Sequence, residues 1–449
     1  FLLKSKTMFW IQLIVVLLAI FIGARLKGIG LGVMGGLGLL ILTFGFHVRP
    51  NVPPINVLLI IISVVTAAST LENAGGLKYL VKIAEKVIRK HPSQITFIAP
   101  IVTYIFTFLS GTTHISYSIL PVIAEVARET NVRPERPLSA SVTAAQQAIT
   151  ASPISAATAT LISLLGPKGI ELSHILIICV PSTLLGVIIC SAVANKIGKE
   201  LNEDSLCIAK MKAILEEEKS QKSNTLKKEN EDPKYGKISI GIFIIGIMFI
   251  IMFGSFKNLR PKWEINGEII ELKMTSIIQI IMLSISAITI MVCNLNPPEI
   301  VRGNIFRSGM QAVIAIFGIA WLGITFFSEN KDYIFNLIQD KIQSAPWLFT
   351  ICLFVLSILL VSQATTTSAL FPLGVDLGIP ALTLLPMFPS VNGLFFLPNH
   401  PTIIAAINFD RTGSTKIGKY VLNHSFMIPG LVATISSVLI GFLLTFILY

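Results

Sequence analysis

Charged side chains are scarce in this sequence. Only 13% of its 449 residues are Asp, Glu, Lys or Arg, whereas 53% are hydrophobic. A soluble domain typically carries about 25% charged residues, so the composition excludes an ordinary soluble fold. The mean hydropathy of +0.77 is typical of an integral membrane protein with many helical spans. We therefore expect an all-α polytopic membrane protein.

Cysteine is also scarce and scattered. None of the five cysteines belongs to a Cys-x-x-Cys or Cys/His cluster, so we expect no disulfide, no metal site and no cofactor. The absence of a nucleophile–base set, of HExxH and of a Walker lysine argues against an enzyme or a transport ATPase. The net charge of +11 comes from basic residues in loops, where they set membrane orientation rather than bind nucleic acid.

Hydroxyl-rich breaks interrupt the apolar stretches in each half of the chain. The first half has SGTTHIS (Ser110 to Ser116) and then TASPIS (Thr150 to Ser155). The second half has SQATTTS (Ser362 to Ser368) and then PNHPT (Pro398 to Thr402). Backbone leaves the helical state at membrane depth only where protein or a water-filled cavity covers it. Paired breaks at matching places in two halves indicate the binding site of a transporter.

Loop charge predicts how these pieces cross the membrane. The segments beside the breaks are shorter than the roughly 20 residues of a spanning helix, which favours re-entrant hairpins. Basic loops fall on the cytoplasmic side if each half has about five spanning helices, one of them broken, plus one hairpin. The two halves then form an inverted repeat of the elevator type, with both termini in the periplasm. Other threadings of the apolar pieces stay open.

The predicted domains follow from this topology. The first repeat covers 8–197, with scaffold helices, a hairpin at 94–127 and a broken helix at 138–165. A charged cytoplasmic linker covers 198–236. The second repeat covers 237–449, with scaffold helices, a hairpin at 346–384 and a broken helix at 391–408. The apolar segment from Met8 to Ala24 lacks a convincing cleavage site, so we expect a first helix rather than a signal peptide, with Met8 as the native start.

The glycine-rich run GIGLGVMGGLG (Gly28 to Gly38) is not a nucleotide loop. No strand precedes it, and the Walker lysine is missing. Small residues one helical turn apart allow two membrane helices to approach closely. We therefore expect close helix packing through Gly32 and Gly36.

The hairpin tips and the broken points supply the candidate substrate-binding groups. The segments 92–127, 137–167 and 343–409 contain no lysine or arginine. A helix N-terminus holds an anion through its free N–H groups, and two such tips with hydroxyl donors suit a small substrate with two carboxylates. The candidates are Thr112, Thr113, His114, Ser116, Ser152, Ser155, Thr365, Thr366, Thr367, Ser368, Asn399 and Thr402. For any single hydroxyl, the alternative is a bond to a preceding carbonyl or to a neighbouring helix.

A second group of side chains is a candidate for coupling or gating: Glu125, Gln146, Asp376, His400, Asp410 and Arg411. Gln146 and its neighbour Gln147 precede the first broken point, and either could reach the ligand or bond to another helix. His114 and His400 stand one at each half's break, so each could carry a proton or be a satisfied polar residue. Arg411 could clamp a carboxylate or pair with Asp410.

Five segments resemble the anaerobic C4-dicarboxylate transporters, the Dcu family of the A/B type: ARLKGIGLGVMGGLG, LENAGGLKYLVKIAE, APIVTYIFTFLSGTTHISYSILPVIAEVA, RPLSASVTAAQQAITASPISAA and DRTGSTKIGKYVLNHSFMIPG. The resemblance covers the chain from Met8, apart from the linker around 200–236. It implies a carrier in the inner membrane of bacteria growing without oxygen, which imports fumarate, malate or aspartate and exports succinate. The resemblance also implies kinship with elevator-type ion transporters, which are usually dimers. The family often has Asn where this chain has His114.

We expect antiport of fumarate or aspartate against succinate by alternating access. An empty moving domain would take unpaired donors through apolar surroundings, which favours obligatory exchange. Thr113→Ala or Thr366→Ala is expected to weaken binding. A proton- or sodium-coupled symporter, a channel, and a transporter that also contacts a membrane sensor kinase through the linker or the loop from Asp410 to Lys419 stay open. So do the preferred dicarboxylate, the direction, the stoichiometry and the oligomeric state.

Overall fold

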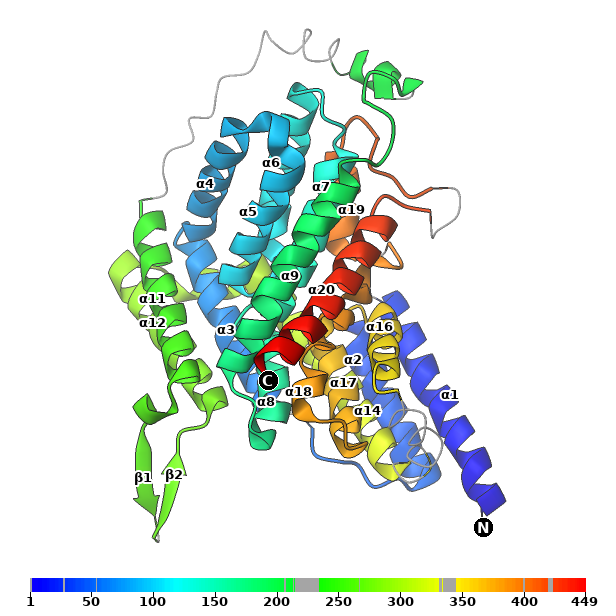
Figure 1. The fold of residues 1–449 in the computed structure, drawn as a ribbon. Coiled ribbons are helices and arrows are strands. Elements are labelled where there is room, and N and C mark those ends of the chain that lie inside the picture. The colour runs from blue at the N-terminus through cyan, green and yellow to red at the C-terminus, as the bar shows by residue number, and fades with distance from the viewer. Residues whose placement is uncertain are drawn as a thin grey trace.

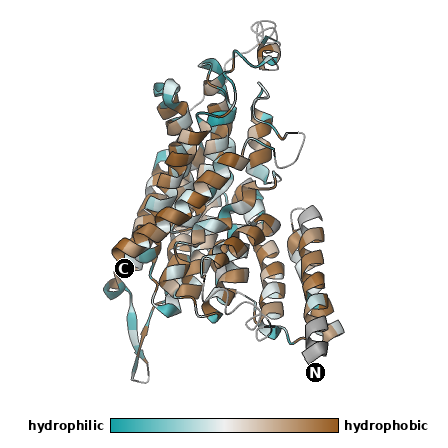
Figure 2. Ribbon diagram, turned by 45° about the vertical axis from the view of Figure 1, so that its right-hand side comes forward, coloured by the Kyte–Doolittle hydropathy of each residue, from teal (hydrophilic) through white to brown (hydrophobic). Residues whose placement is uncertain are grey.

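The computed structural model describes residues 2–26, 29–53, 55–205, 207–212, 214, 234–265, 267–330, 333, 345–398, 400–418 and 423–449. Helices make up nearly all of this part of the chain, and most of them run along the long axis of the molecule (Figure 1). Hydrophobic residues dominate the helices, while hydrophilic ones gather toward the two ends (Figure 2). Most of the linker predicted at 198–236 lies outside the described residues.

The helices of the first half are α1 (Leu2–Leu26), α2 (Gly30–Leu40), α3 (Ile55–Asn73), α4 (Gly76–Lys90), α5 (Ile95–Ser110), α6 (Ser116–Glu129), α7 (Glu135–Ala151), α8 (Ala156–Leu165) and α9 (Leu172–Ala194). A π-helical turn, η1 (Ile41–Gly45), extends α2. The short 3-10 turns are η2 (Pro92–Gln94), η3 (Thr113–Ile115) and η4 (Gly166–Lys168).

The second half contains α11 (Gly236–Ser255), α12 (Met274–Cys293), α13 (Pro297–Arg302), α14 (Asn304–Glu329), α16 (Leu348–Leu360), α17 (Gln363–Asp376), α18 (Ala381–Leu384), α19 (Pro401–Phe409) and α20 (Met427–Leu448). Its 3-10 helices are η5 (Lys257–Leu259) and η6 (Phe388–Phe395). Between α11 and α12, β1 (Lys262–Ile265) and β2 (Glu268–Glu271) pair antiparallel, with Lys262 opposite Glu271.

Several helices are long and apolar enough to cross a membrane. Seven of them qualify alone among the described residues: Pro92–Ser110, Glu135–Lys168, Leu172–Ala194, Gly236–Ser255, Met274–Cys293, Ile305–Glu329 and Met427–Leu448. Helices α3 and α4 are bent by 70° at a short break and together pass the same test as an eighth. The chain is therefore a multi-pass membrane protein.

Helices joined by tight turns occupy the positions of the predicted hairpins. Helix α5 ends at Gly111, whose φ of +66° is a left-handed conformation that suits glycine, and the chain turns back into α6. Helix α16 ends at Val361, a β-branched residue at a φ of +50°, before α17 begins. Helices α7 and α8 are separated by Ser152 to Ser155, where the broken helix was expected.

The second half departs from the predicted boundaries. The hairpin was expected to run to residue 384, but its second arm α17 ends at Asp376. Gly378 adopts a φ of +78° and Pro380 lacks a backbone N–H, so the helix cannot continue. The next elements are α18 and then η6, in which Asn392 has the non-helical angles φ −90° and ψ 23°. The broken helix predicted at 391–408 corresponds to η6, which begins at Phe388, and α19, which ends at Phe409.

Glycines bring α2 and α14 into backbone contact. A Cβ added at Gly32, Gly35 or Gly318 would collide with the backbone of the opposite helix. Gly36, which was expected to share this role, has nothing within 4 Å of such a Cβ. Successive residues of a helix are about 100° apart around its axis, so Gly35 faces α14 and Gly36 faces away.

Corresponding helices of the two halves pack in reciprocal pairs. Helix α3 packs against α12 and α2 against α14, which joins the second and third long helices of each half crosswise. Helix α17 packs against α8, α19 against α6, and the last helices α9 and α20 lie together. Every residue of helix α7 is buried.

Candidate functional site

The tip of the α5–α6 pair touches the break between α7 and α8. A Cβ added at Gly111 would lie 2.8 Å from Cγ1 of Ile154, so the turn packs directly on the broken point. The Ser152 hydroxyl donates to the carbonyl of Phe108 on α5 at 2.7 Å. The first tip and the first break therefore form one unit.

A chain of buried amides connects this unit to the second half. Asn392 of η6 donates through Nδ2 to Oε1 of Gln147 at 3.1 Å and to the Thr150 hydroxyl at 3.3 Å. Nε2 of Gln363, the first residue of α17, donates to Oδ1 of Asn392 at 3.2 Å. Gln147 in turn donates to the Thr434 hydroxyl of α20 at 3.0 Å. These bonds join both breaks and the second tip.

Asn392 and Gln363 were not among the residues predicted to form the site. Gln363 lies inside the SQATTTS motif, and Asn392 is an amide within the apolar run FPSVNGLFF. A polar side chain within a membrane span indicates a functional position. That signal could have found Asn392, but nothing local indicates that it meets Gln147.

Four helices begin where these segments meet. Figure 1 shows α6 and α19 running toward one end of the molecule and α8 and α17 toward the other. Side chains cap the first turns: Thr112 accepts from the N–H of His114, Ser155 from that of Thr158, and Ser362 from that of Thr365. Each helix start carries a partial positive charge and free N–H groups. We call this region, residues 110–116, 146–155, 362–368, 392–398 and 400–402, the four-break centre.

His400 caps α19 with its ring. Nδ1 of His400 accepts the backbone N–H of Thr402 at 3.4 Å and lies 2.8 Å from the Thr402 hydroxyl. A ring nitrogen that accepts an N–H carries no proton, so the proton of the neutral imidazole is on Nε2. Nε2 of His400 is then a donor.

Most of the candidate hydroxyls donate to protein acceptors. Thr366 and Thr367 donate to the carbonyls of Ser362 and Gln363, both at 2.8 Å, and Thr365 donates to the Ser362 hydroxyl. Ser155 donates to the carbonyl of Ile149 at 2.6 Å. A hydroxyl has one hydrogen to donate, so these groups shape the backbone at the breaks.

Three candidates differ. The hydroxyls of Ser116 and Ser368 and both amide atoms of Gln146 are buried, with no hydrogen-bond partner among the described residues. Leaving a buried polar group unpaired costs about 1–3 kcal/mol. Such groups are rare in native proteins and call for an explanation. One explanation is that these groups are available to bind a ligand.

The charged candidates lie away from the four-break centre. Glu125, near the end of α6, pairs with Arg128 at 2.5 Å. Asp376 is an exposed residue at the end of α17. Asp410 is buried and accepts bonds from Thr412, Ser414 and Thr415 within its own loop, while Arg411 is exposed. Asn399 lies outside the described residues.

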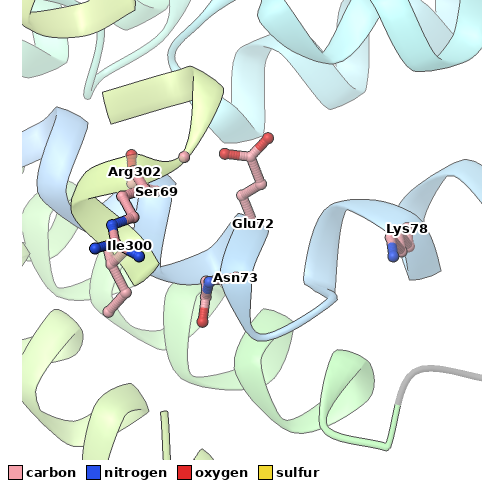
Figure 3. Close-up of a pocket in the computed structure, with 7 residues that line it drawn as sticks. Ser69, Glu72, Asn73, Lys78, Ile300 and Arg302 are labelled. Atoms are coloured by element: carbon pink, nitrogen blue, oxygen red, sulfur yellow. The ribbon is translucent and has the colours of Figure 1, made fainter. Parts of the chain in front are cut away.

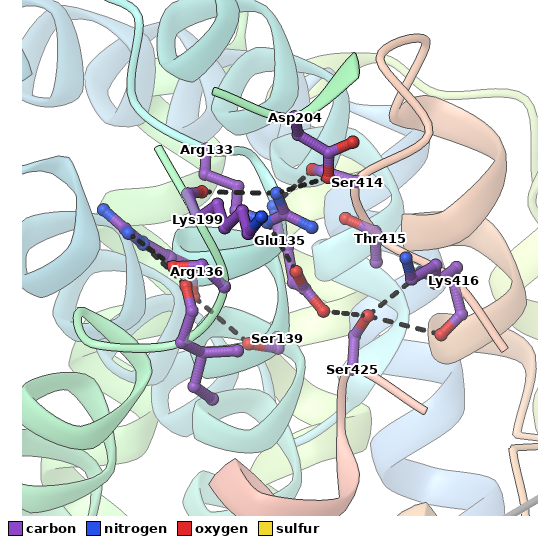
Figure 4. A network of polar contacts seen from close by, with 12 residues as sticks. Arg133, Glu135, Arg136, Ser139, Lys199, Asp204, Ser414, Thr415, Lys416 and Ser425 are labelled. Carbon is purple, nitrogen blue, oxygen red and sulfur yellow. Dashed lines mark hydrogen bonds and ion pairs between the residues drawn. The ribbon is translucent and has the colours of Figure 1, made fainter. Parts of the chain in front are cut away.

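A charged network lies at the start of α7 (Figure 4). Glu135 accepts from Nε of Arg133 at 2.7 Å and from the Ser425 hydroxyl at 2.6 Å. Arg133, only 3% exposed, also bonds to Asp204 at 3.0 Å. Burial alone would lower the pKa of Arg133, but its bonds to Glu135 and Asp204 raise it above its usual value. We call Arg133, Glu135, Asp204, Ser414 and Ser425 the linker-end network.

The chain is similar to known transporters along nearly its whole length. A family described as "Anaerobic c4-dicarboxylate membrane transporter" matches residues 8–449. C4-dicarboxylate transporter DcuA of Escherichia coli K12 is 42% identical over 435 residues, which cover 97% of this chain and 98% of the relative. DcuA of Wolinella succinogenes is 39% identical over 437 residues, covering 97% and 99%. Anaerobic C4-dicarboxylate transporter DcuB of Escherichia coli O6:H1 is 37% identical over 442 residues, covering 97% and 98%.

A solved structure of MtrF from Neisseria gonorrhoeae aligns with 90% of this chain and 84% of its own at 11% identity. Its TM-score is 0.49.

Proposed function

Because this chain belongs to the family of anaerobic C4-dicarboxylate membrane transporters, we propose that it carries C4-dicarboxylates across the membrane by binding them in the four-break centre. It is a transporter and not an enzyme. One observation supports this site above all: Ser116, Ser368 and Gln146 keep buried polar atoms unpaired in a region without lysine or arginine.

The two carboxylates would be held by two sets of helix starts. The starts of α6 and α19, with Thr112, Thr113, His114, Ser116, His400 and Thr402, form one set. The starts of α8 and α17, with Ser155, Thr365 and Ser368, form the other. The partial charges and N–H groups at these starts stabilise an anion without a basic side chain. A dianion would thus span the gap between the two sets.

The reciprocal packing of the two halves supports an inverted repeat. The third long helix of each half packs against the second long helix of the other half. The helix that follows each tip, α6 or α17, packs against the broken element of the other half. In an elevator mechanism α2, α3, α12 and α14 would form the static scaffold. The two helix pairs and the two broken elements would move past it with the substrate. A homodimer formed through the scaffolds fits this division.

Exchange is the expected mode of transport. Moving the empty domain would carry the unpaired donors through apolar surroundings, which costs free energy. Bound fumarate, malate, aspartate or succinate would pair those donors and lower the barrier. The histidines at the two breaks, His114 and His400, favour a second mode, proton-coupled symport, in which an imidazole carries the proton.

The location follows from the family and from the loop charges. We expect the bacterial inner membrane, with the linker in the cytoplasm. Both chain ends lie toward the end of the molecule opposite residues 198–212 (Figure 1). This arrangement favours periplasmic termini. A contact with a membrane sensor kinase would involve the exposed Arg411 or the linker.

The test is uptake of labelled fumarate into proteoliposomes in sodium-free buffer, with and without trapped succinate. Exchange predicts uptake only with trapped succinate. Uptake that ignores internal succinate and follows an imposed proton or sodium gradient would replace exchange by symport. Uptake of neither fumarate nor aspartate under any gradient would contradict the proposal. To locate the site, uptake is compared between vesicles with Ser116→Ala protein and vesicles with Ser118→Ala protein. Ser118 is an exposed serine of the same helix, so only Ser116→Ala should weaken uptake.

A further inference from the structure

A polar cavity lies at the elbow where α3 bends into α4 (Figure 3). It has a volume of about 340 Å³, and its lining includes Ser69, Glu72, Asn73, Lys78, Ile300 and Arg302. We call it the elbow pocket. None of these residues belongs to the four-break centre or to the helices that form it. A ligand in this pocket would therefore be distinct from the transported substrate.

The elbow pocket contains two cations without ion-pair partners. Lys78, in the first turn of α4, and Arg302, at the end of α13, are exposed. Neither forms an ion pair within the described part of the chain. On an isolated surface this would be unremarkable for a solvated lysine or arginine, but here both line one cavity. Two such cations favour an anionic group in the cavity.

One carboxylate faces the same cavity. Oε2 of Glu72 accepts the backbone N–H of Ile305 at 3.3 Å, which fixes the side chain at the start of α14. Figure 3 shows Glu72 between Arg302 on one side and Lys78 on the other. A carboxylate there repels a purely anionic ligand and attracts an ammonium group. The charge pattern thus complements a zwitterion.

Ser69 adds an observation that points to a ligand. It is 1% exposed, and its hydroxyl is buried without a hydrogen-bond partner among the described residues. Ser69 is one of the residues that line the elbow pocket. An unpaired hydroxyl in such a place costs free energy that a bound acceptor recovers.

The depth of the pocket indicates where its ligand comes from. The apolar part of α3 ends at Asn73, and the candidate span of α14 begins at Ile305. The pocket therefore lies where these spans leave the hydrocarbon, which is the depth of lipid headgroups. Helix α4 packs Leu77 and Leu80 inward and presents Lys78 and further basic residues outward. Basic residues at this depth attract lipid phosphates.

We propose that the elbow pocket binds the headgroup of an aminophospholipid, with the phosphate beside Arg302 and Ser69, the primary ammonium at Glu72, and Lys78 adding positive charge to the pocket from the other side of Glu72. Ser69 and Asn73 would donate to phosphate oxygens. The headgroup would connect α13 and the end of α3 to α4, which leads to the first helix pair. This assignment does not depend on the substrate site.

Native mass spectrometry of the full-length protein tests it. The detergent-solubilised protein is mixed with equal amounts of phosphatidylethanolamine, phosphatidylcholine and phosphatidylglycerol. We expect phosphatidylethanolamine to bind best, because a trimethylated ammonium cannot donate to Glu72 and phosphatidylglycerol has no ammonium. Lys78→Gln with Arg302→Gln should weaken its binding about tenfold, the product of about threefold for each partly exposed charge. Glu72→Gln, which keeps an acceptor for Ile305, should remove the preference over phosphatidylglycerol.

The matched control is Arg307→Gln, an exposed arginine of α14 that does not line the pocket. It should leave lipid binding unchanged. Equal binding of the three lipids, or equal binding by the double variant and the unaltered protein, would overturn the proposal. Binding of soluble glycerophosphoethanolamine without binding of the lipid would overturn the membrane source. If the unaltered protein binds the lipid as expected but does not transport dicarboxylates, the proposed function fails and the lipid site stands.

Discussion

The four-break centre and the linker-end network are both polar and buried, but their polar groups are in opposite states. In the network, Glu135 accepts from Arg133 and Ser425, and Arg133 also meets Asp204. The four-break centre contains no Asp, Glu, Lys or Arg. The hydroxyls of Ser116 and Ser368 there have no hydrogen-bond partner among the described residues. The charges of the linker-end network therefore hold segments of the chain together, while the uncharged groups of the four-break centre that lack partners are available to a ligand.

Removing a charge of the linker-end network should lower the stability of the protein most. Glu135→Ala leaves Arg133 with a single carboxylate partner in a site where Arg133 is 3% exposed. Breaking a buried pair typically costs about 3–5 kcal/mol, and we expect about 3 kcal/mol because Asp204 remains. Thermal unfolding in detergent measures it. The control is Glu85→Ala, whose partner Arg89 is 43% exposed, and which should cost under about 1 kcal/mol. Equal losses in the two variants would contradict the comparison.

Cutting the amide chain should come next. Asn392→Ala removes two donated bonds and one accepted bond, and it leaves Gln147 and Gln363 short of partners. We expect a loss of about 2 kcal/mol in the free energy of unfolding, together with weaker substrate binding because both breaks shift. Ser390→Ala, which removes one local bond in the same 3-10 helix, should change stability and uptake much less. If it matches Asn392→Ala, the amide chain does not connect the breaks.

Removing an unpaired hydroxyl should leave stability unchanged but weaken binding. Ser116→Ala and Ser368→Ala delete groups that have no partner within the described residues, so unfolding should not become easier. The KM for fumarate should rise about fivefold, because one hydrogen bond to a charged group contributes about 1 kcal/mol or more. Thr367→Ala, whose hydroxyl bonds to Gln363, is the matched comparison and should raise KM less.

The smallest effect is expected from a charge outside both regions. Glu125 pairs with Arg128 and is 39% exposed, so Glu125→Gln should change the free energy of unfolding by under about 1 kcal/mol. Uptake at pH 7 should stay within about twofold. A large loss of gradient-driven uptake without a loss of stability would instead make Glu125 a coupling group.

The breaks could be located from the sequence because the residues that end helices are local signals. Gly111, Pro153 and Ser362 interrupt apolar stretches, and the structure breaks its helices at these points. The end of α17 was misplaced because the apolar run continues past Gly378 and Pro380. Gly35 was missed as a contact because a repeat of small residues does not say how far a helix is rotated about its axis.

Other features needed information that apolar segments do not carry. Helix α4 buries Leu77, Leu80, Ala84 and Ile88 on one face, a helical spacing hidden among basic residues. In the sequence an Asn-Gly pair at 266–267 stands between β1 and β2, and this strong turn signal is not an apolar segment. The Asn392–Gln147 bond joins positions far apart in the chain, so no local pattern could have predicted it.

The crosswise pairing of the halves also constrains how the protein is made. Helix α2 lies against α14 and α3 against α12, so the first half reaches the membrane before its partners exist. Chains grow at about 5–20 residues per second, so α14 follows α2 by on the order of tens of seconds. During that delay the glycine face of α2 must be covered by lipid or by the insertion machinery. A chain whose synthesis stops after α9 would expose this face and become a substrate for membrane quality control.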